Sequence, residues 1–434
     1  MSVERNSQLT KLSTPGFSQR RQWAGNQSIG FLIQQSVENV DVVSLAVGLV
    51  DQQSLPVEET RKAFEKLFGS DERARQALQY GTTPGAEPFR EELRKHLARL
   101  ENCEVEQLGI DVDQLMMTTG SQQLLSLVGE MLFDPGDLCL VAAPTYFVFL
   151  DVLSGLGVRT VPVKANQNGM CMDSLENELN RIDSEGELDR VKAIYIVSYY
   201  ENPTGISLGA ERRPQLIEIA QKWSRQHRIF VIEDAAYREL RYDGPALPSV
   251  WSYDKSKQTV ILAQTFSKSY SPGLRVGFGV LPVDLVEAIL NRKSNEDFGS
   301  SNFGQSLLCT VLHEGLYQPH VKHVCDSYRK KRDCMLTAAK RYFANLDGVE
   351  WVHPHGGLYV WMTLPENVET GFQSDLFQRA TKIDKVMYVP GELCYPSDSP
   401  LKQTNQMRLS YGVQDEEGIA LGMQRLAAAV RAVL

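Results

Sequence analysis

The stretch TFSKSYSPGLR, residues 265–275, places a lysine and an arginine among hydroxyl side chains. Lys268 lies between Ser267 and Ser269, and Arg275 follows a Pro-Gly turn. Hydroxyls and a forked guanidinium suit an anion that carries several oxygens. A protonated lysine is a poor nucleophile, but burial and a neighbouring cation lower its pKa and prepare it to form a Schiff base. Taken alone, the stretch also fits a solvated lysine in a serine-rich loop.

Two further stretches place polar groups where an apolar strand ends. In TTGSQQ, residues 118–123, a strand stops at Gly120 and a helix begins at Ser121, so free N–H groups and the helix dipole form a cradle for an anion. In ENPTG, residues 201–205, proline and glycine fix a turn that would hold the Asn202 amide over the sheet. The alternative interpretations are an ordinary helix start and a plain turn.

The stretch IEDAAY, residues 232–237, ends an apolar strand with a carboxylate. Burial of an unpaired carboxylate is costly, so Asp234 is expected to have a cationic partner, and a protonated ring nitrogen would serve. Tyr237, three residues on, could reach the same ligand with its phenol. The alternative is that Asp234 only caps the following segment.

Together these stretches supply an anion cradle, an amide, a buried carboxylate, a phenol, a lysine and an arginine. Pyridoxal phosphate needs the same set of groups: an amine for its aldehyde, donors for its phosphate, partners for its 3′ oxygen and an acid beside its ring nitrogen. The acid keeps the ring protonated, which lets the ring absorb carbanion charge. The joint pattern is far more specific than any single stretch and predicts this cofactor.

Short apolar runs alternate with helical periods through the middle of the chain. Helices are expected over 121–133 and 211–227, and the expected strands are 114–118, 137–144, 158–163, 191–197, 228–234, 259–266 and 275–282. This alternation predicts an α/β fold with a mainly parallel sheet covered on both faces. Ligands of such sheets bind at the carboxyl ends of the strands, where the stretches above lie.

The chain of 434 residues exceeds the usual size of one domain. After residue 283 the alternation gives way to long helices and then to short strands, which indicates a second, α+β domain. We expect residues 61–300 to form the large domain and 301–434 the small one, with segment 1–60 packed on the small domain.

Composition excludes several classes of partner. A net charge of −9 and a pI near 5.5 argue against nucleic acid, and no apolar run is long enough to span a membrane. Seven cysteines without a CxxC pair and the absence of a leader-like N-terminus favour the cytoplasm. No acidic or cysteine partner is expected to complete a metal set near the pairs His320/His323 and His353/His355, so no metal site is expected.

The sequence resembles the fold type I pyridoxal-phosphate-dependent aminotransferases, class I/II branch, from about residue 40 to the C-terminus. The motifs that carry the resemblance are YGTTPG, TTGSQQ, PTY, ENPTG, EDAAY, TFSKSYSPGLR, GGLYVW and NQMRLSY. The resemblance implies a mainly parallel, seven-stranded type of sheet in a large cofactor-binding domain, and a smaller α+β domain built from both ends of the chain. The forms PTY and GSQQ lean toward the aminoadipate/kynurenine aminotransferase-like group.

The same resemblance implies a role for each matching residue. Lys268 would form the internal aldimine and move the proton between Cα and C4′, and Asp234 would pair with the pyridinium nitrogen. Asn202 and Tyr237 would bind the 3′ oxygen. The residues expected around the phosphate are Gly120, Ser121, Gln122, Thr265, Ser267 and Arg275.

Four more positions follow from the resemblance. Tyr146 would stack on the ring, and Tyr80 would reach the phosphate of the neighbouring subunit in a homodimer. Arg408 would grip the substrate α-carboxylate as a bidentate clamp, beside Asn202 and Gly48.

The chain departs from the family at a few positions. It has Gly-Leu-Val-Asp over 48–51 where the family often has Gly-x-Pro-Asp, which puts the substrate preference in doubt. EDAAY replaces EDxPY, while Ser198 and Glu201 replace a common proline and a common glutamine or histidine. None of these changes removes a residue expected to contact the cofactor.

The activity expected from the resemblance is transfer of an amino group from an L-amino acid to a 2-oxo acid, with 2-oxoglutarate and glutamate as the default couple. Two alternatives remain open. The first is another reaction of the same cofactor, catalysed by a lyase, a decarboxylase or a cyclopropane-forming synthase. The second is a regulatory module that binds the cofactor without catalysis.

Overall fold

A large mixed sheet forms the centre of the computed structural model, which describes residues 16–23, 30 and 41–434. The strand order is β2-β9-β8-β7-β6-β3-β4-β5. The strands are β2 (Leu115–Thr118), β3 (Leu138–Ala143), β4 (Arg159–Asn166), β5 (Gly169–Met170), β6 (Val191–Val197), β7 (Phe230–Asp234), β8 (Val260–Thr265) and β9 (Gly277–Val280). Neighbours from β8 to β4 are parallel, whereas β9 is antiparallel to both β2 and β8. The mainly parallel sheet is confirmed, and the eighth strand is the two-residue β5, antiparallel to β4.

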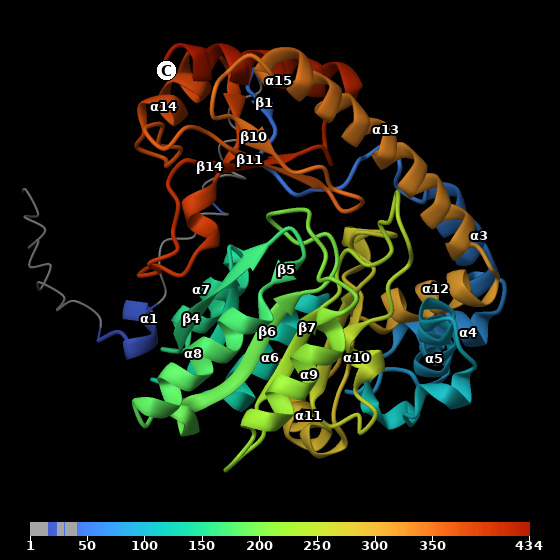
Figure 1. The fold of residues 1–434 in the computed structure, drawn as a ribbon. Coiled ribbons are helices and arrows are strands. Elements are labelled where there is room, and N and C mark those ends of the chain that lie inside the picture. Colours follow the sequence, from blue (N-terminus) through green and yellow to red (C-terminus); the bar gives the residue numbers. More distant parts are fainter. Residues whose placement is uncertain (1–15, 24–29, 31–40) are drawn as a thin grey trace, which may run out of the picture.

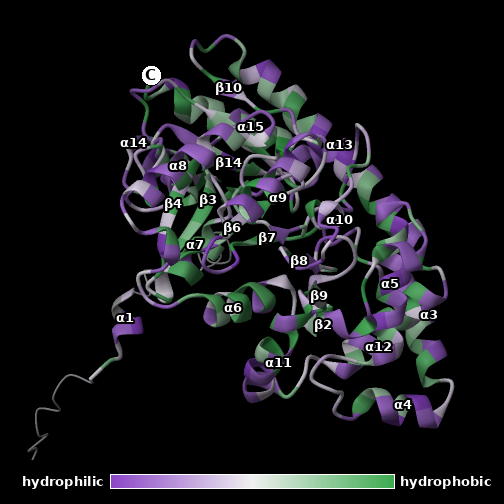
Figure 2. Ribbon diagram, turned by 60° about the horizontal axis from the view of Figure 1, so that its bottom comes forward, coloured by the Kyte–Doolittle hydropathy of each residue, from purple (hydrophilic) through white to green (hydrophobic). Residues whose placement is uncertain are grey.

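The central strands are buried on both faces because helices cover both. Every residue of β3, β7 and β8 is buried, as the near-continuous apolar runs of these strands predict. On one face lie α8 (Met172–Ser184), α9 (Arg212–Trp223) and the short α10 (Val250–Tyr253); on the other lie α6 (Ser121–Leu132), α7 (Phe147–Gly155) and α11 (Val283–Asp297). In Figure 2, β3 and β4 are mainly hydrophobic, while the outer helix α4 alternates between hydrophilic and hydrophobic residues.

A second layer lies above the carboxyl edge of this sheet (Figure 1). Its antiparallel sheet has the order β10-β11-β14-β13, formed by β10 (Glu350–Trp351), β11 (Tyr359–Thr363), β14 (Gln406–Ser410) and β13 (Val389–Pro390). The helices α14 (Asp375–Lys382) and α15 (Glu416–Arg431) cover it. The long helix α13 (Tyr317–Phe343) contacts α15 in this layer and descends to α12 (Asn302–His313).

The N-terminal part of the described chain contacts both layers. β1 (Val43–Ser44) pairs in parallel with β12 (Val386–Met387) of the upper layer, as expected for segment 1–60. In contrast, α1 (Gln19–Trp23) packs on α7 of the large sheet, where the Ser154 hydroxyl donates to the Trp23 carbonyl at 3.1 Å. The segment thus has contacts in both layers, and the domain boundaries at 60 and 300 stay a prediction.

The helices that follow β1 pack beside the large sheet. They are α3 (Val57–Phe68), α4 (Asp71–Leu78) and α5 (Glu87–Glu101), and α12 packs on all three. Short 3₁₀ turns lie at Val105–Leu108, Val112–Gln114, Leu188–Arg190, Pro272–Leu274 and Gly391–Cys394. No helix of the described residues is both long and apolar enough to cross a bilayer, and all seven cysteines are unbridged.

Candidate active site

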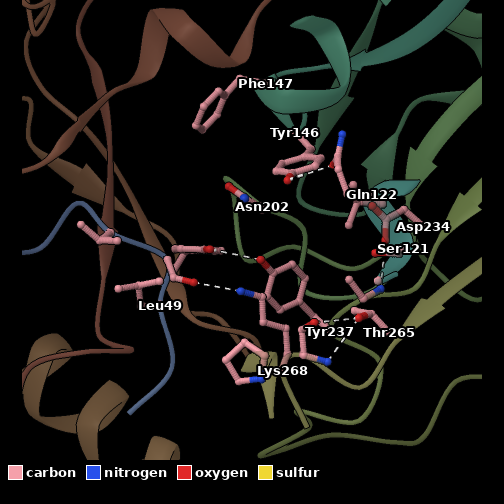
Figure 3. Close-up of a pocket in the computed structure, with 18 of the residues that line it drawn as sticks. Leu49, Ser121, Gln122, Tyr146, Phe147, Asn202, Asp234, Tyr237, Thr265 and Lys268 are labelled. Atoms are coloured by element: carbon pink, nitrogen blue, oxygen red, sulfur yellow. Dashed lines mark hydrogen bonds between the residues drawn. The ribbon is translucent and has the colours of Figure 1, made fainter. Parts of the chain in front are cut away.

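One cavity of about 310 Å³ lies where the carboxyl ends of β2, β6, β7 and β8 face the upper layer. All but one of the predicted site residues line it (Figure 3). These are Gly48, Gly120, Ser121, Gln122, Tyr146, Asn202, Asp234, Tyr237, Thr265, Ser267, Lys268, Arg275 and Arg408. The exception is Tyr80, which does not line the cavity and is 84% exposed. Its predicted position in the site of a second subunit stays a prediction.

Lys268 follows β8 and points its amine into the cavity (Figure 3). Its Nζ donates a hydrogen bond to the Gly48 carbonyl at 2.9 Å. Burial lowers the pKa of the Lys268 amine, and the Arg408 and Arg275 cations act in the same direction. A larger fraction of the amine is therefore unprotonated at neutral pH than for a lysine in water, which is the state that attacks a carbonyl.

Asp234 ends β7 and is buried. Its Oδ2 accepts from the Tyr195 hydroxyl at 3.1 Å and its Oδ1 from the Ala236 N–H at 3.0 Å. Burial raises the pKa of the Asp234 carboxyl to about 6, because neither hydrogen bond brings a positive charge. A cation that entered the cavity beside Asp234 would stabilise the ionised carboxylate.

A cradle for an anion lies at the start of α6. Gly120 precedes the helix with a φ of 79°, a conformation that favours glycine. A Cβ at Gly120 would lie 2.9 Å from Nη2 of Arg275, and a Cβ at Gly277 would lie 2.7 Å from the backbone of Gly120. Strand β9 and the Arg275 side chain therefore pack closely against the first residues of α6. The N–H groups of α6 and the guanidinium therefore converge on one point.

Hydroxyl groups complete this cradle. The Thr265 hydroxyl donates to the Ser267 hydroxyl at 3.0 Å, and Nη1 of Arg275 lies 3.5 Å from the same Ser267 oxygen. A further hydrogen bond fixes the Arg275 guanidinium, since its Nη2 donates to the Thr119 carbonyl at 3.2 Å. Guanidinium, hydroxyls and helix amides together match the oxygens of a phosphate.

Arg408 enters the cavity from β14 and is buried. Its Nη1 donates to the Asn202 side-chain oxygen at 2.7 Å, and its Nη2 donates to the Ala46 carbonyl at 2.6 Å. The guanidinium carbon lies 4.3 Å from the centre of the Tyr359 ring. Its buried Nε has no hydrogen-bond partner among the described residues, so the arginine keeps a donor for an anionic ligand.

Aromatic side chains form the remaining wall. The Tyr146 hydroxyl donates to the Gln122 side-chain oxygen at 3.4 Å, and the Tyr237 and Tyr359 hydroxyls lie 3.1 Å apart. Burial raises the pKa of Tyr237, which keeps its phenol protonated as a donor at neutral pH. The rings therefore provide a flat, partly apolar slot with hydroxyl groups at its edge.

Several lining residues were not predicted as site residues. Tyr359 lies in the GGLYVW motif, two residues before Trp361, which pairs with Arg408 across β11 and β14. Strand alternation therefore places Tyr359 on the same face as Arg408, a signal that was available in the sequence. Phe147 directly follows the PTY motif, whereas Leu49 reaches the cavity only through the packing of a distant segment.

The expectation that no acidic residue accompanies His353 and His355 is wrong. The ligand atoms of Asp243, His353 and His355 lie within 4.8 Å of one another. However, the Asp243 carboxylate already forms an ion pair with Arg332, whose charge opposes a metal cation. That the protein has no metal site stays a prediction.

Known proteins resemble this chain along most of its length. The family model described as "Aminotransferase class I and II" matches residues 40–421. The aromatic-amino-acid aminotransferase 1 of Thermococcus litoralis is 32% identical over 395 residues, which cover 91% of this chain and 89% of that protein. The 2-aminoadipate transaminase of Thermus thermophilus is also 32% identical, covering 91% of each chain.

Among solved structures, the kynurenine aminotransferase of Pyrococcus horikoshii, in complex with PMP, KYN and KYA, superimposes with a TM-score of 0.87 at 32% identity. The match covers 96% of this chain and 98% of the other. The fold of this chain is thus shared with an enzyme whose structure was solved in complex with PMP.

The raised pKa of Asp234 predicts a specific pH dependence of stability. Its pKa is about 6 in the folded protein against an ordinary value of 3.8, so the fold favours the protonated acid and loses this contribution as the pH rises through 6. Between pH 4 and pH 7 the free energy of unfolding of cofactor-free Asp234→Asn should rise by about 2 kcal/mol relative to that of the wild type. Denaturant unfolding at a series of pH values measures the difference.

Burial also raises the pKa of Glu201, to about 8, and Glu201 therefore adds its own pH dependence to the stability. Because the wild type and Asp234→Asn both contain Glu201, this contribution cancels when the two proteins are compared. Parallel stability profiles for the two proteins would contradict the raised pKa of Asp234.

Proposed function

This chain belongs to the class I and II aminotransferases. We propose that its cavity binds pyridoxal phosphate, and that the protein there transfers an amino group from an L-amino acid to 2-oxoglutarate. The observation that carries this proposal is the meeting of Lys268, Asp234, Arg275 and Arg408 around one space of about 310 Å³. The protein is a pyridoxal-phosphate-dependent transferase, and we propose the identity of its substrates and the role of each residue in the cavity.

The residues present fit the cofactor. The cradle at the start of α6, with Arg275, suits the phosphate, and the buried Asp234 carboxylate lacks the positive partner that a protonated ring nitrogen would provide. When bound, pyridoxal phosphate supplies an aldehyde for the amino group and a ring that accepts electrons from the substrate carbon. Tyr146 would lie on the ring face, and Asn202 and Tyr237 would donate to its 3′ oxygen.

Lys268 is the amine proposed to bind the aldehyde and to move a proton at the substrate Cα. Its lowered pKa supports both tasks, since an amine that releases its proton more readily than a lysine in water can both accept and return one. The Gly48 carbonyl, 2.9 Å from Nζ, holds the amine at one place in the cavity before any ligand arrives.

Arg408 is proposed to bind the substrate α-carboxylate. Its contacts with Asn202 and Ala46 fix the plane of the guanidinium, so that the free Nε donor and the positive charge are oriented before the substrate binds. Orientation established in advance lowers the entropic cost of aligning the amino group with its target.

The relatives support a broad substrate class rather than one compound. Their printed names refer to aromatic amino acids, 2-aminoadipate and kynurenine. We propose an L-amino acid of this kind as donor, a homodimer in which Tyr80 reaches the neighbouring site, and a cytoplasmic location, to which the seven unbridged cysteines are suited.

A donor panel tests the activity. Purified holoenzyme is mixed with 2-oxoglutarate and one of phenylalanine, kynurenine, 2-aminoadipate or alanine, and glutamate and the new oxo acid are quantified. Equal amounts of both products are expected. Release of an amine or an alkene without glutamate would instead identify a lyase, decarboxylase or synthase, and cofactor binding without turnover would identify a regulatory module.

Replacement of Lys268 tests the covalent site. Lys268→Ala should lose the borohydride-stable link between protein and cofactor and lower kcat by at least about 1000-fold, because the same amine binds and moves protons. Mass spectrometry of the reduced protein measures the link. Lys257→Ala is the matched control, since burial lowers the pKa of Lys257 too but this side chain lies over the Trp251 ring, outside the cavity. A pyridoxyl mass retained in Lys268→Ala would refute the assignment.

Replacement of Arg408 tests the carboxylate clamp. Arg408→Ala should lower kcat/KM by about 100-fold for phenylalanine and for 2-aminoadipate alike, because both carry the α-carboxylate. Arg408→Lys keeps the charge but loses the forked donors and should recover only part of the activity. If only one of the two donors were affected, Arg408 would bind the side chain instead.

A further inference from the structure

Residues 46–51 form a segment that closes one side of the cavity. Ala46, Val47, Gly48 and Leu49 all line it. The segment is held by two groups already placed in the site, since Arg408 donates to the Ala46 carbonyl and Lys268 donates to the Gly48 carbonyl. Figure 3 shows the bond from Lys268 to this segment, with Leu49 beside it at the cavity wall.

The other end of the segment is fixed to α13. The Asp51 carboxylate lies 3.1 Å from Nζ of Lys331, with side chains only 8% and 9% exposed. The Asp51 N–H donates to the Tyr328 hydroxyl at 2.9 Å. Tyr328 and Lys331 are three residues apart and so lie on the same face of the helix. A charged pair this well removed from water holds its geometry strictly, because either charge left alone would be buried without a partner.

The segment between these two attachments has little freedom to shift. A Cβ at Gly48 would overlap the Tyr359 hydroxyl, and a Cβ at Gly412 would lie 2.5 Å from the Leu49 carbonyl. Only two residues, Leu49 and Val50, separate Gly48 from Asp51. A displacement of Asp51 is therefore passed on to Gly48 and Leu49, at the wall that faces the ligand.

We propose that Asp51, Lys331 and Tyr328 are positioning residues that set the place of Gly48 and Leu49 and thereby the fit of the substrate side chain. The inference rests on the proposed roles of Lys268 and Arg408, which put the substrate in this cavity. Leu49 is 54% exposed and lines the cavity, so it is available to a ligand, whereas Asp51, Lys331 and Tyr328 do not line the cavity and act through the backbone.

The pair is tested with Asp51→Asn, Lys331→Met, and both changes together. Each single variant should raise the KM for phenylalanine about tenfold with little change in cofactor content, because Leu49 meets the large side chain of this donor. A shift of Gly48, whose carbonyl holds the Lys268 amine, should lower kcat for phenylalanine and alanine alike. The KM for alanine, which has almost no side chain to meet Leu49, should stay near that of the wild type. The double variant should be no worse than the worse single variant, since both changes remove one interaction.

Lys330→Met is the matched control: Lys330 is the preceding residue on α13, it is exposed, and its replacement should leave both KM values unchanged. Lys331→Arg, which keeps the charge, should recover part of the phenylalanine KM. Where the charge variants do not fold, Tyr328→Phe decides, since it removes only the hydroxyl that accepts the Asp51 N–H and should raise the KM for phenylalanine in the same selective way.

Three results would overturn the proposal: additive effects in the double variant, an equal rise of KM for phenylalanine and alanine, or variants that match Lys330→Met. Failure of the proposed function is recognised separately, because the wild type itself would then form no glutamate from any donor.

Discussion

The structure depends on a carboxylate held out of water without a positive partner. Asp234 ends a strand in the middle of the large sheet, and its two hydrogen bonds come from a phenol and a backbone amide, both neutral. Desolvation of such a group is unfavourable, and this is why its pKa lies near 6. A ligand that brings a positive charge to this point relieves the cost, which supports the proposed place of a protonated ring nitrogen beside Asp234.

The remaining charges of the cavity have the opposite sign. Lys268, Arg275 and Arg408 all line it. They come from different parts of the chain: Lys268 follows β8, Arg275 precedes β9, and Arg408 lies in β14. Enclosure by low-dielectric walls strengthens their field, which favours ligands that carry a phosphate or a carboxylate. Separation of the three cations around the single acid lets one cavity hold two anionic molecules, a cofactor and a substrate, without competition for the same donor.

Residues at the ends of strands were predictable because their signals are local. An apolar run that stops at Gly120, Asp234 or Thr265 marks a strand end, and parallel strands bring such ends to one edge. The resemblance placed the loop 48–51 beside the substrate, but the attachment of this loop to α13 was not predicted, because it depends on an ion pair between residues 280 positions apart, Asp51 and Lys331. The same holds for Asp243 beside His353, which the bridge between Arg241 and Gly356 brings together. The two-residue strand β5 carries too short a pattern to be recognised.

The long helix α13 has a further consequence for the site. At 27 residues and about 1.5 Å of rise per residue, it extends roughly 40 Å, from α15 in the upper layer to α12 below. Lys331 lies almost at its midpoint. Through the ion pair between Asp51 and Lys331, the cavity wall is thus attached midway along the helix that joins the two layers, so a single helix connects this wall to both of them.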